Sequence, residues 1–197
     1  LQGKANLVWQ KWLDAGVASY GGSVFPLGAA GYLIAGSLNN KAWLVRIDSA
    51  GGVLWQKSYQ GKTITFADNG VVTADGGIVL AGSTYEFSEF NARNAIVFKV
   101  DTTGGILWQK RFVGQGDLSV RAITALADGG LAVAGTRDDG NDTNVVLFKL
   151  SGSGAIVWEK EFGGTDWDLG DDVIELPNQE LLVLASTRSW GVGQNDL

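Results

Sequence analysis

The octet GILWQKRF, residues 105–112, has three near-copies elsewhere in the chain. They read NLVWQKWL at residues 6–13, GVLWQKSY at 52–59 and AIVWEKEF at 155–162. The tryptophan of each copy follows the previous one after about 50 residues. These tryptophans are Trp9, Trp55, Trp108 and Trp158. Self-similarity at this period is typical of repeat folds, in which each repeat is one supersecondary unit.

Two further phrases recur in step with the octet. The first reads GGIVLAGS at 76–83 and GGLAVAGT at 129–136, and the second reads IVFKVD at 96–101 and VLFKLS at 146–151. A weaker apolar pattern, such as VRAITALA at 120–127, precedes the first phrase. Each repeat therefore contains four short strands. Four strands in roughly 50 residues predict the blade of a β-propeller.

We therefore predict an all-β fold, a β-propeller of four-stranded antiparallel blades with four repeats and an incomplete last blade. It spans the whole chain of 197 residues. The approximate units are residues 1–48, 49–101, 102–151 and 152–197. The 29 glycines and 2 prolines suit many strands joined by tight turns. The separator ADGG, at 74–77 and 127–130, predicts hairpin turns, because such turns need the positive φ that Asp-Gly pairs accept.

The octet alternates in the manner of a β-strand. Ile106, Trp108, Lys110 and Phe112 share one face, so that face carries two large aromatic rings around a lysine. A single blade leaves such a face uncovered. We therefore predict that the octet tryptophans pack between neighbouring blades, with the lysine stem lying along the aromatic rings.

The run FKVDTTGGILWQKRF, residues 98–112, resembles the blade motif of the PQQ-type quinoprotein propellers and their non-enzymatic bacterial relatives. The runs at 45–59 and 148–162 are similar to it. In that motif an Asp precedes a glycine-containing turn, which leads into a strand with a docking tryptophan. The Asp position holds Asp48, Asp101 and Ser151. The resemblance covers essentially the whole chain and implies a secreted bacterial repeat propeller of the non-enzymatic branch.

The enzymatic relatives imply PQQ, a bound calcium ion and a catalytic carboxylate, usually in a ring of eight blades with a vicinal disulfide. This chain has four units and no cysteine, and only structural positions match. The last unit ends at residues 191–197, before most of its fourth strand. We expect an ordered portion of a longer array. A self-contained four-bladed ring and self-association through the incomplete last blade are the alternatives.

Charge and composition exclude several functions. The formal net charge is −6 and no basic stripe is present, so we predict no nucleic-acid partner. The chain has no Cys, which excludes disulfides and a thiol nucleophile, and no His, which removes the commonest general base and metal ligand. No apolar run is long enough for a membrane span.

The loop GGTDWDLGDD, residues 163–172, suggests a calcium site through its clustered carboxylates. Its acidic residues are Asp166, Asp168, Asp171 and Asp172. The spacing differs from that of an EF-hand loop. We favour the alternative that these residues cap backbone amides in a turn, and we predict no metal ion and no other cofactor.

Aromatic residues outside the repeat are candidates for ligand contact. The insertion at residues 83–94 carries Tyr85, Phe87 and Phe90, and exposed aromatic rings on a long loop suit a binding surface. Trp167 and Trp190 also lie outside the repeated positions and are candidates for stacking on sugars. Packing against a blade edge is the alternative for all five.

The function that we predict is a non-catalytic extracellular or cell-surface module for binding, adhesion or scaffolding, with a protein or glycan partner. Its location in the periplasm is an alternative. A fragment of a quinoprotein-like enzyme is the second hypothesis. A structural subunit of a surface assembly or filament is the third.

Overall fold

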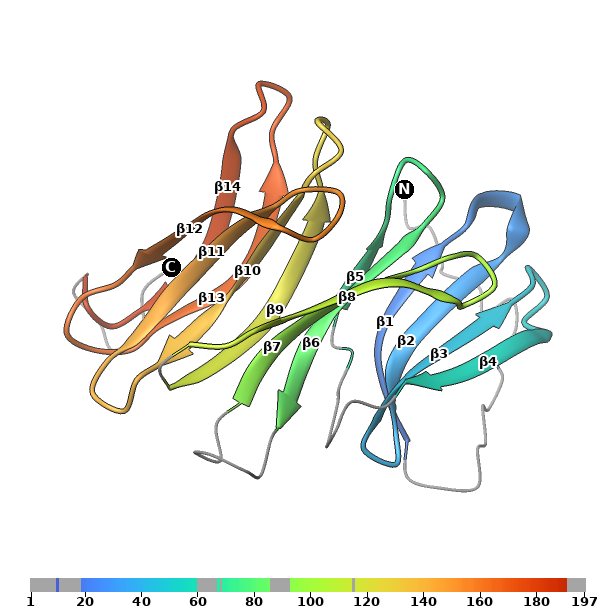
Figure 1. Ribbon diagram of the computed structural model, residues 1–197, viewed down its shortest axis with the longest axis horizontal. Coiled ribbons are helices and arrows are strands. Elements are labelled where there is room, and N and C mark those ends of the chain that lie inside the picture. The colour runs from blue at the N-terminus through green and yellow to red at the C-terminus, as the bar shows by residue number, and fades with distance from the viewer. Residues whose placement is uncertain are drawn as a thin grey trace, which may run out of the picture.

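The computed structural model describes residues 10, 19–59, 67, 69–85, 93–114 and 116–190. These residues form strands and turns, with one short 3-10 helix at Gly28–Ala30 (Figure 1). The prediction of an all-β fold with four-stranded antiparallel sheets is confirmed. None of the described residues belongs to a helix that is long and apolar enough to cross a membrane.

The strands form four sheets, which we number in chain order. Sheet 1 contains β1 (Ser19–Pro26), β2 (Tyr32–Leu38), β3 (Lys41–Ile47) and β4 (Val53–Tyr59). Sheet 2 contains β5 (Asn69–Val72), β6 (Ile78–Tyr85), β7 (Arg93–Val100) and β8 (Ile106–Phe112). Sheet 3 contains β9 (Asp117–Ala125), β10 (Leu131–Asp138), β11 (Thr143–Leu150) and β12 (Ile156–Phe162). Sheet 4 contains β13 (Asp168–Glu175) and β14 (Leu181–Thr187). Residues 191–197, where the sequence ends before the predicted fourth strand, lie outside the described residues.

The sheets do not coincide with the units expected from the repeat. The octet strands β4, β8 and β12 each pair with the strand that precedes them in the chain, so the octet closes a sheet and does not begin one. The reason is a short hairpin turn before each octet, in which Asp48 N–H donates to the Gly52 carbonyl and Asp101 N–H donates to that of Gly105. The sheet boundaries therefore differ from the approximate units 49–101 and 102–151.

Three-residue hairpin turns with a left-handed third residue recur through the sheets. Gly76 and Gly129 of the two ADGG segments have φ of 79° and 81°, as the sequence predicts. The motif aspartates cap the turns before the octets. Asp101 Oδ1 accepts the backbone N–H of Thr103 at 2.7 Å and that of Gly105 at 2.9 Å. The repeated Asp thus fixes the turn that aims the octet strand.

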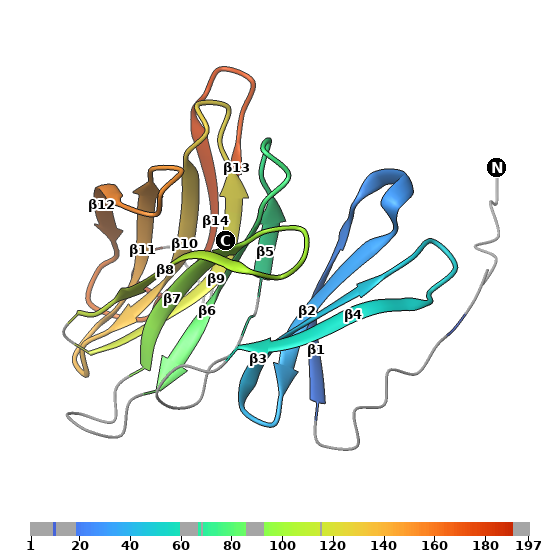
Figure 2. The same ribbon diagram turned by 45° about the vertical axis from the view of Figure 1, so that its right-hand side comes forward.

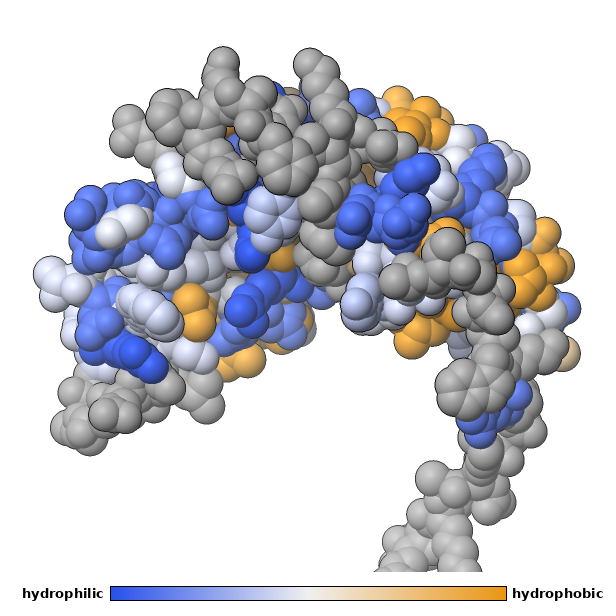
Figure 3. Space-filling model, turned by 90° about the horizontal axis from the view of Figure 1, so that it is seen from below, coloured by the Kyte–Doolittle hydropathy of each residue, from blue (hydrophilic) through white to orange (hydrophobic). Residues whose placement is uncertain are grey.

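The four sheets follow one another from sheet 1 to sheet 4, face against face (Figures 1 and 2). The first strands of neighbouring sheets contact each other, β1 with β5, β5 with β9 and β9 with β13. Seen from below, the molecule curves as an arc around a hollow (Figure 3). We call β1, β5, β9 and β13 the inner strands because they contact one another from sheet to sheet, and β4, β8 and β12 the outer strands because they form the opposite edges of their sheets.

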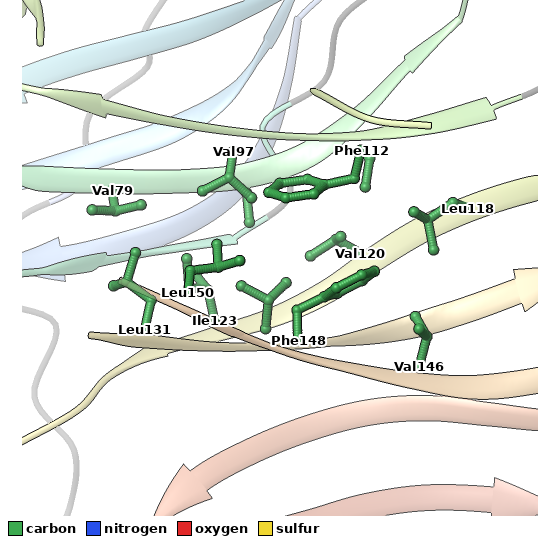
Figure 4. Close-up of a cluster of buried hydrophobic side chains, with 13 residues drawn as sticks. Val79, Val97, Phe112, Leu118, Val120, Ile123, Leu131, Val146, Phe148 and Leu150 are labelled. Carbon is green, nitrogen blue, oxygen red and sulfur yellow. The ribbon is translucent and has the colours of Figure 1, made fainter. Parts of the chain in front are cut away.

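The largest core cluster lies between sheets 2 and 3. Val97 and Phe112 of sheet 2 point toward Leu131 and Phe148 of sheet 3 (Figure 4). The rings of Phe112 and Phe148 are 5.4 Å apart. Full burial of each aliphatic or aromatic side chain contributes roughly 1.5–3 kcal/mol, so the faces between sheets hold the fold together.

The octet tryptophans lie at the outer rim of these interfaces. Trp108 is half-buried against the core between sheets 2 and 3, and its Nε1–H donates to the Gly152 carbonyl of sheet 3 at 3.1 Å. Trp55 packs against the core between sheets 1 and 2. Trp158 packs against the core between sheets 3 and 4, with the Lys160 ammonium 5.5 Å from its ring. Trp9 lies outside the described residues.

Candidate binding site

The inner strands carry β-bulges that direct single side chains away from the ladder. In β9, Val120 pairs with Gly135 and Ala122 with Ala134, so Arg121 between them has no partner in β10. In β13 the same shift leaves Asp171 without a partner in β14. A bulge re-aims the side chain of the extra residue and is over-represented beside binding and active sites.

A pocket of about 410 Å³ opens where these two bulges meet sheet 2. Its lining residues are Ser83, Arg93, Ser119, Val120, Arg121 and Asp171. Ser83 lies near the end of β6 and Arg93 begins β7, so both flank the insertion that the sequence singles out at residues 83–94. The pocket is thus built from three sheets and lies at the inner strands.

Arg121 and Asp171 form a weak ion pair across the pocket. The distance from Arg121 Nη1 to Asp171 Oδ1 is 3.4 Å, and the Arg121 side chain is 54% exposed. The backbone of Arg121 is held more firmly, because Asn69 Nδ2 donates to its carbonyl at 3.0 Å. Asp171 Oδ2 accepts the hydroxyl of Ser186 at 2.9 Å. The Arg121 backbone and the Asp171 carboxylate are therefore both held, while the Arg121 guanidinium stays accessible to a ligand.

Arg93 is oriented by Tyr85, one of the aromatic residues that the sequence nominates. Its Nε donates to the Tyr85 hydroxyl at 2.8 Å, and its guanidinium carbon lies 5.2 Å from the centre of the Tyr85 ring. The backbone N–H of Arg93 donates to Asp117 Oδ1 at 2.7 Å. Tyr85 therefore supports the pocket from its edge. Phe87 and Phe90 lie outside the described residues.

Trp167 and Trp190 are exposed at the same end of sheet 4, just before β13 begins and just after β14 ends. Their exposed fractions are 57% and 58%. The guanidinium of Arg188 lies 5.1 Å from the centre of the Trp167 ring. The backbone N–H of Arg188 donates to the Trp167 carbonyl at 2.8 Å. Trp167 precedes Asp171 by four residues, which is about 13 Å along a strand. Two exposed indole rings thus lie at the end of sheet 4 where β13 begins, and the Arg188 guanidinium lies against one of them.

The acidic loop does not gather its carboxylates. Burial of Asp168 raises its carboxyl pKa, but hydrogen bonds from Thr187, Ser189 and Gly164 outweigh this effect and hold the pKa below its usual value. Asp168 thus ties the loop to the end of β14. Asp166 and Asp172 each accept the backbone N–H of the next residue.

Asp171 is directed to the pocket, away from these local contacts. Within the described ranges, no group of three or more Asp and Glu side chains is placed to hold a metal ion. The loop therefore has the turn-capping contacts that the sequence favours as the alternative to calcium.

Sequence reasoning missed Ser83, Arg93, Ser119 and Arg121. A bulge depends on a two-against-one pairing with the next strand, which no local residue pattern announces. Alignment of the repeats could have pointed to these positions, because the residue at the bulge varies: it is Gly22 in β1, Arg121 in β9 and Asp171 in β13.

Comparison of the sequence with protein-family models and with curated proteins finds no match.

Proposed function

We propose that this chain is a propeller-type, non-catalytic binding module that works outside the cell or at its surface and takes its ligand at the inner-strand pocket. The radial order of the strands supports a propeller arrangement, because β1, β5, β9 and β13 contact one another in turn. The resemblance of the octet run to quinoprotein-like propeller repeats supports it as well.

The observation that carries the binding role is the pocket at the two bulges. The sheets around the pocket are formed by residues that recur from repeat to repeat. Arg121 and Asp171, by contrast, occupy equivalent bulges of β9 and β13 but carry opposite charges. Pockets of roughly 300–1,000 Å³ with a few convergent polar groups are the usual sites for small ligands. Trp167 and Trp190 are exposed at the end of sheet 4 where β13 begins, and exposed aromatic rings suit a glycan or a protein surface.

The lining supports binding without catalysis. Its hydroxyl groups are those of Ser83 and Ser119, and activation of either one needs a general base. Asp171 is the one carboxylate among the lining residues, and it already accepts bonds from Arg121 and Ser186. The chain has no His and no Cys to take either role.

A screen of immobilised glycans and surface proteins tests this proposal. The wild-type chain and an Arg121→Gln variant are compared on the same array, with Lys110→Gln on the outer strand β8 as a charge-matched control. A ligand that is retained by Lys110→Gln and lost by Arg121→Gln supports the pocket. Binding that Arg121→Gln leaves unchanged, or turnover of a bound substrate, contradicts the proposal.

A second function, as a subunit of an assembly, is favoured by the open face of sheet 4. Leu182 and Leu184 are 54% and 49% exposed, whereas Ala132 and Ala134 at the same positions of β10 are fully buried under sheet 4. We take a second copy of the chain as the partner of this apolar face. The outward face of sheet 1 is a poor docking surface for it, because Val24 is 63% exposed there but Trp43 and Val45 are buried.

Light scattering against concentration tests the assembly. We expect the wild-type chain to associate, Leu184→Glu to abolish the association, and Leu54→Glu to leave it unchanged, because Leu54 is equally exposed but lies on the outer strand β4. A wild-type chain that stays monomeric at high concentration, or an equal effect of both variants, contradicts this second function.

A further inference from the structure

We infer that the inner-strand pocket binds the carboxylate of an acidic sugar residue in a glycan. The inference rests on the proposed binding function and names its ligand class. It is carried by the available guanidinium donors, the net charge of the lining and the polar groups that suit hydroxyls.

The two guanidinium groups hold donors for a further acceptor. Among the described residues, the side chain of Arg93 bonds only to Tyr85, through Nε, which leaves both Nη groups available. Within the part of the chain that the structure describes, the side chain of Arg121 bonds only to Asp171, at the long distance of 3.4 Å. By contrast, Arg137 reaches Glu159 and Glu161 at 2.6 and 2.8 Å. Planar guanidinium groups match the two oxygens of a carboxylate, so the weakly committed pair suits this ligand.

The net charge of the pocket lining favours a ligand group with a single negative charge. Two arginines and Asp171 together carry one net positive charge, in a chain whose total is −6. A monoanion such as a carboxylate balances this charge. A phosphate dianion leaves an excess negative charge close to Asp171, which is repulsive at short range. Asp117, which accepts the backbone N–H of Arg93, adds to that repulsion from outside the lining.

The remaining lining groups suit hydroxyls. Asp171 is an acceptor for a ligand hydroxyl, and the hydroxyls of Ser83 and Ser119 act as donors or acceptors. Ser119 is only weakly engaged, since its hydroxyl lies 3.5 Å from the Thr136 carbonyl. The one apolar lining residue, Val120, is 2% exposed, and the other lining residues are polar or charged, so the accessible lining is more polar than apolar. A polar ring with hydroxyls fits this lining better than a lipid or an aromatic ligand.

Calorimetric titration with trigalacturonic acid, galacturonic acid and neutral galactotriose tests the inference on the full chain. We expect both acids to bind, and the neutral trimer to bind at least about tenfold more weakly, because a hydrogen bond to a charged group is worth about 1.5–3 kcal/mol. Arg121→Gln should lose at least about tenfold in affinity for the acids, and Lys110→Gln should lose none. Asp171→Asn, which removes the lining carboxylate, should improve the binding of inorganic phosphate relative to the wild type.

Equal affinity for the neutral and acidic trimers, or unchanged acid binding by Arg121→Gln, overturns the acidic-sugar inference. If a neutral sugar then binds and its affinity falls in Arg121→Gln, the proposed binding function at this pocket still holds. Failure of the folded chain to bind any sugar or surface protein through this pocket overturns both. Circular dichroism of each variant is the control that tests whether the sheets remain folded.

Discussion

The contact between Trp108 and Gly154 can be tested by adding a single methyl group to the turn. Gly154 and Gly129 are a matched pair, because each ends a hairpin turn with φ near 80° and donates its N–H to the residue three positions earlier. A Cβ added at Gly129 meets no atom within 4 Å. A Cβ added at Gly154 lies 2.7 Å from the six-membered ring of Trp108. The two substitutions therefore differ mainly in the clash with the indole.

In both alanine variants the left-handed backbone conformation lowers the free energy of unfolding by about 1–2 kcal/mol. Gly154→Ala adds a clash that the indole cannot relieve freely, since the hydrogen bond from Trp108 to Gly152 fixes the ring. Overpacking of this kind costs about 1–3 kcal/mol, so we expect Gly154→Ala to be less stable than Gly129→Ala by about that amount.

Urea unfolding of the two variants, each with Trp108 intact and with Trp108→Ala, forms a double-mutant cycle. The extra loss of Gly154→Ala should disappear when the indole is absent. Equal losses for both glycines, or an excess that survives in the Trp108→Ala background, refutes the account of the tryptophan as an inter-sheet contact.

Three further predictions concern single contacts. The Lys99 ammonium, 2.6 Å from Asp75, holds the pKa of that carboxyl below its ordinary 3.8, so its stabilisation is complete above that pH and is lost as pH falls through the lowered pKa. Asp75→Asn should therefore lower the urea midpoint more at about pH 7 than at about pH 2. Burial raises the pKa of Tyr59 from 10.0 to about 12, so the wild-type chain should lose stability between these values as pH rises, and Tyr59→Phe should lose less in alkaline urea titrations. Gln179 has φ of 65° at the turn position that Gly129 holds in sheet 3, so Gln179→Gly should raise the unfolding free energy by about 1 kcal/mol.

The sequence predicts the local structure well because the local signals are strong. Asp-Gly turns demand positive φ, and the alternation around Trp108 defines one face of a strand. The period alone leaves the sheet boundary undefined, because a repeat can be cut at any of its turns. The boundary of sheet 1 is set by the pairing of β4 with β3, which the hairpin turn at Asp48 brings about.

The binding site is less predictable, because it depends on contacts between sheets. Arg121 and Asp171 come from repeats 50 residues apart, and their meeting depends on how sheet 3 packs on sheet 4. From the sequence, Asp171 is a calcium candidate beside the favoured turn-capping role, and Tyr85 is a candidate for direct ligand contact. In the structure Asp171 faces a guanidinium and Tyr85 orients Arg93.

The repeated glycine in the AGS and AGT phrases lies where the second strand of a sheet approaches its inner strand most closely. A Cβ on Gly36 or Gly135 would collide with the carbonyl of Tyr20 or Ser119 in the adjacent inner strand, next to the bulge of that strand. In sheets 1 and 3 this glycine therefore lets the inner strand approach closely beside its bulge, whereas in sheet 4 the bulge lies opposite Ala185. The bulges of β9 and β13 each direct one side chain, that of Arg121 or Asp171, to a partner outside the sheet. A mutation that changes only the bulged residue alters the chemistry of the pocket without disturbing the packing between sheets. Chemical differences among otherwise similar repeats are thus expected at Arg121 and its equivalents, and not at the tryptophans.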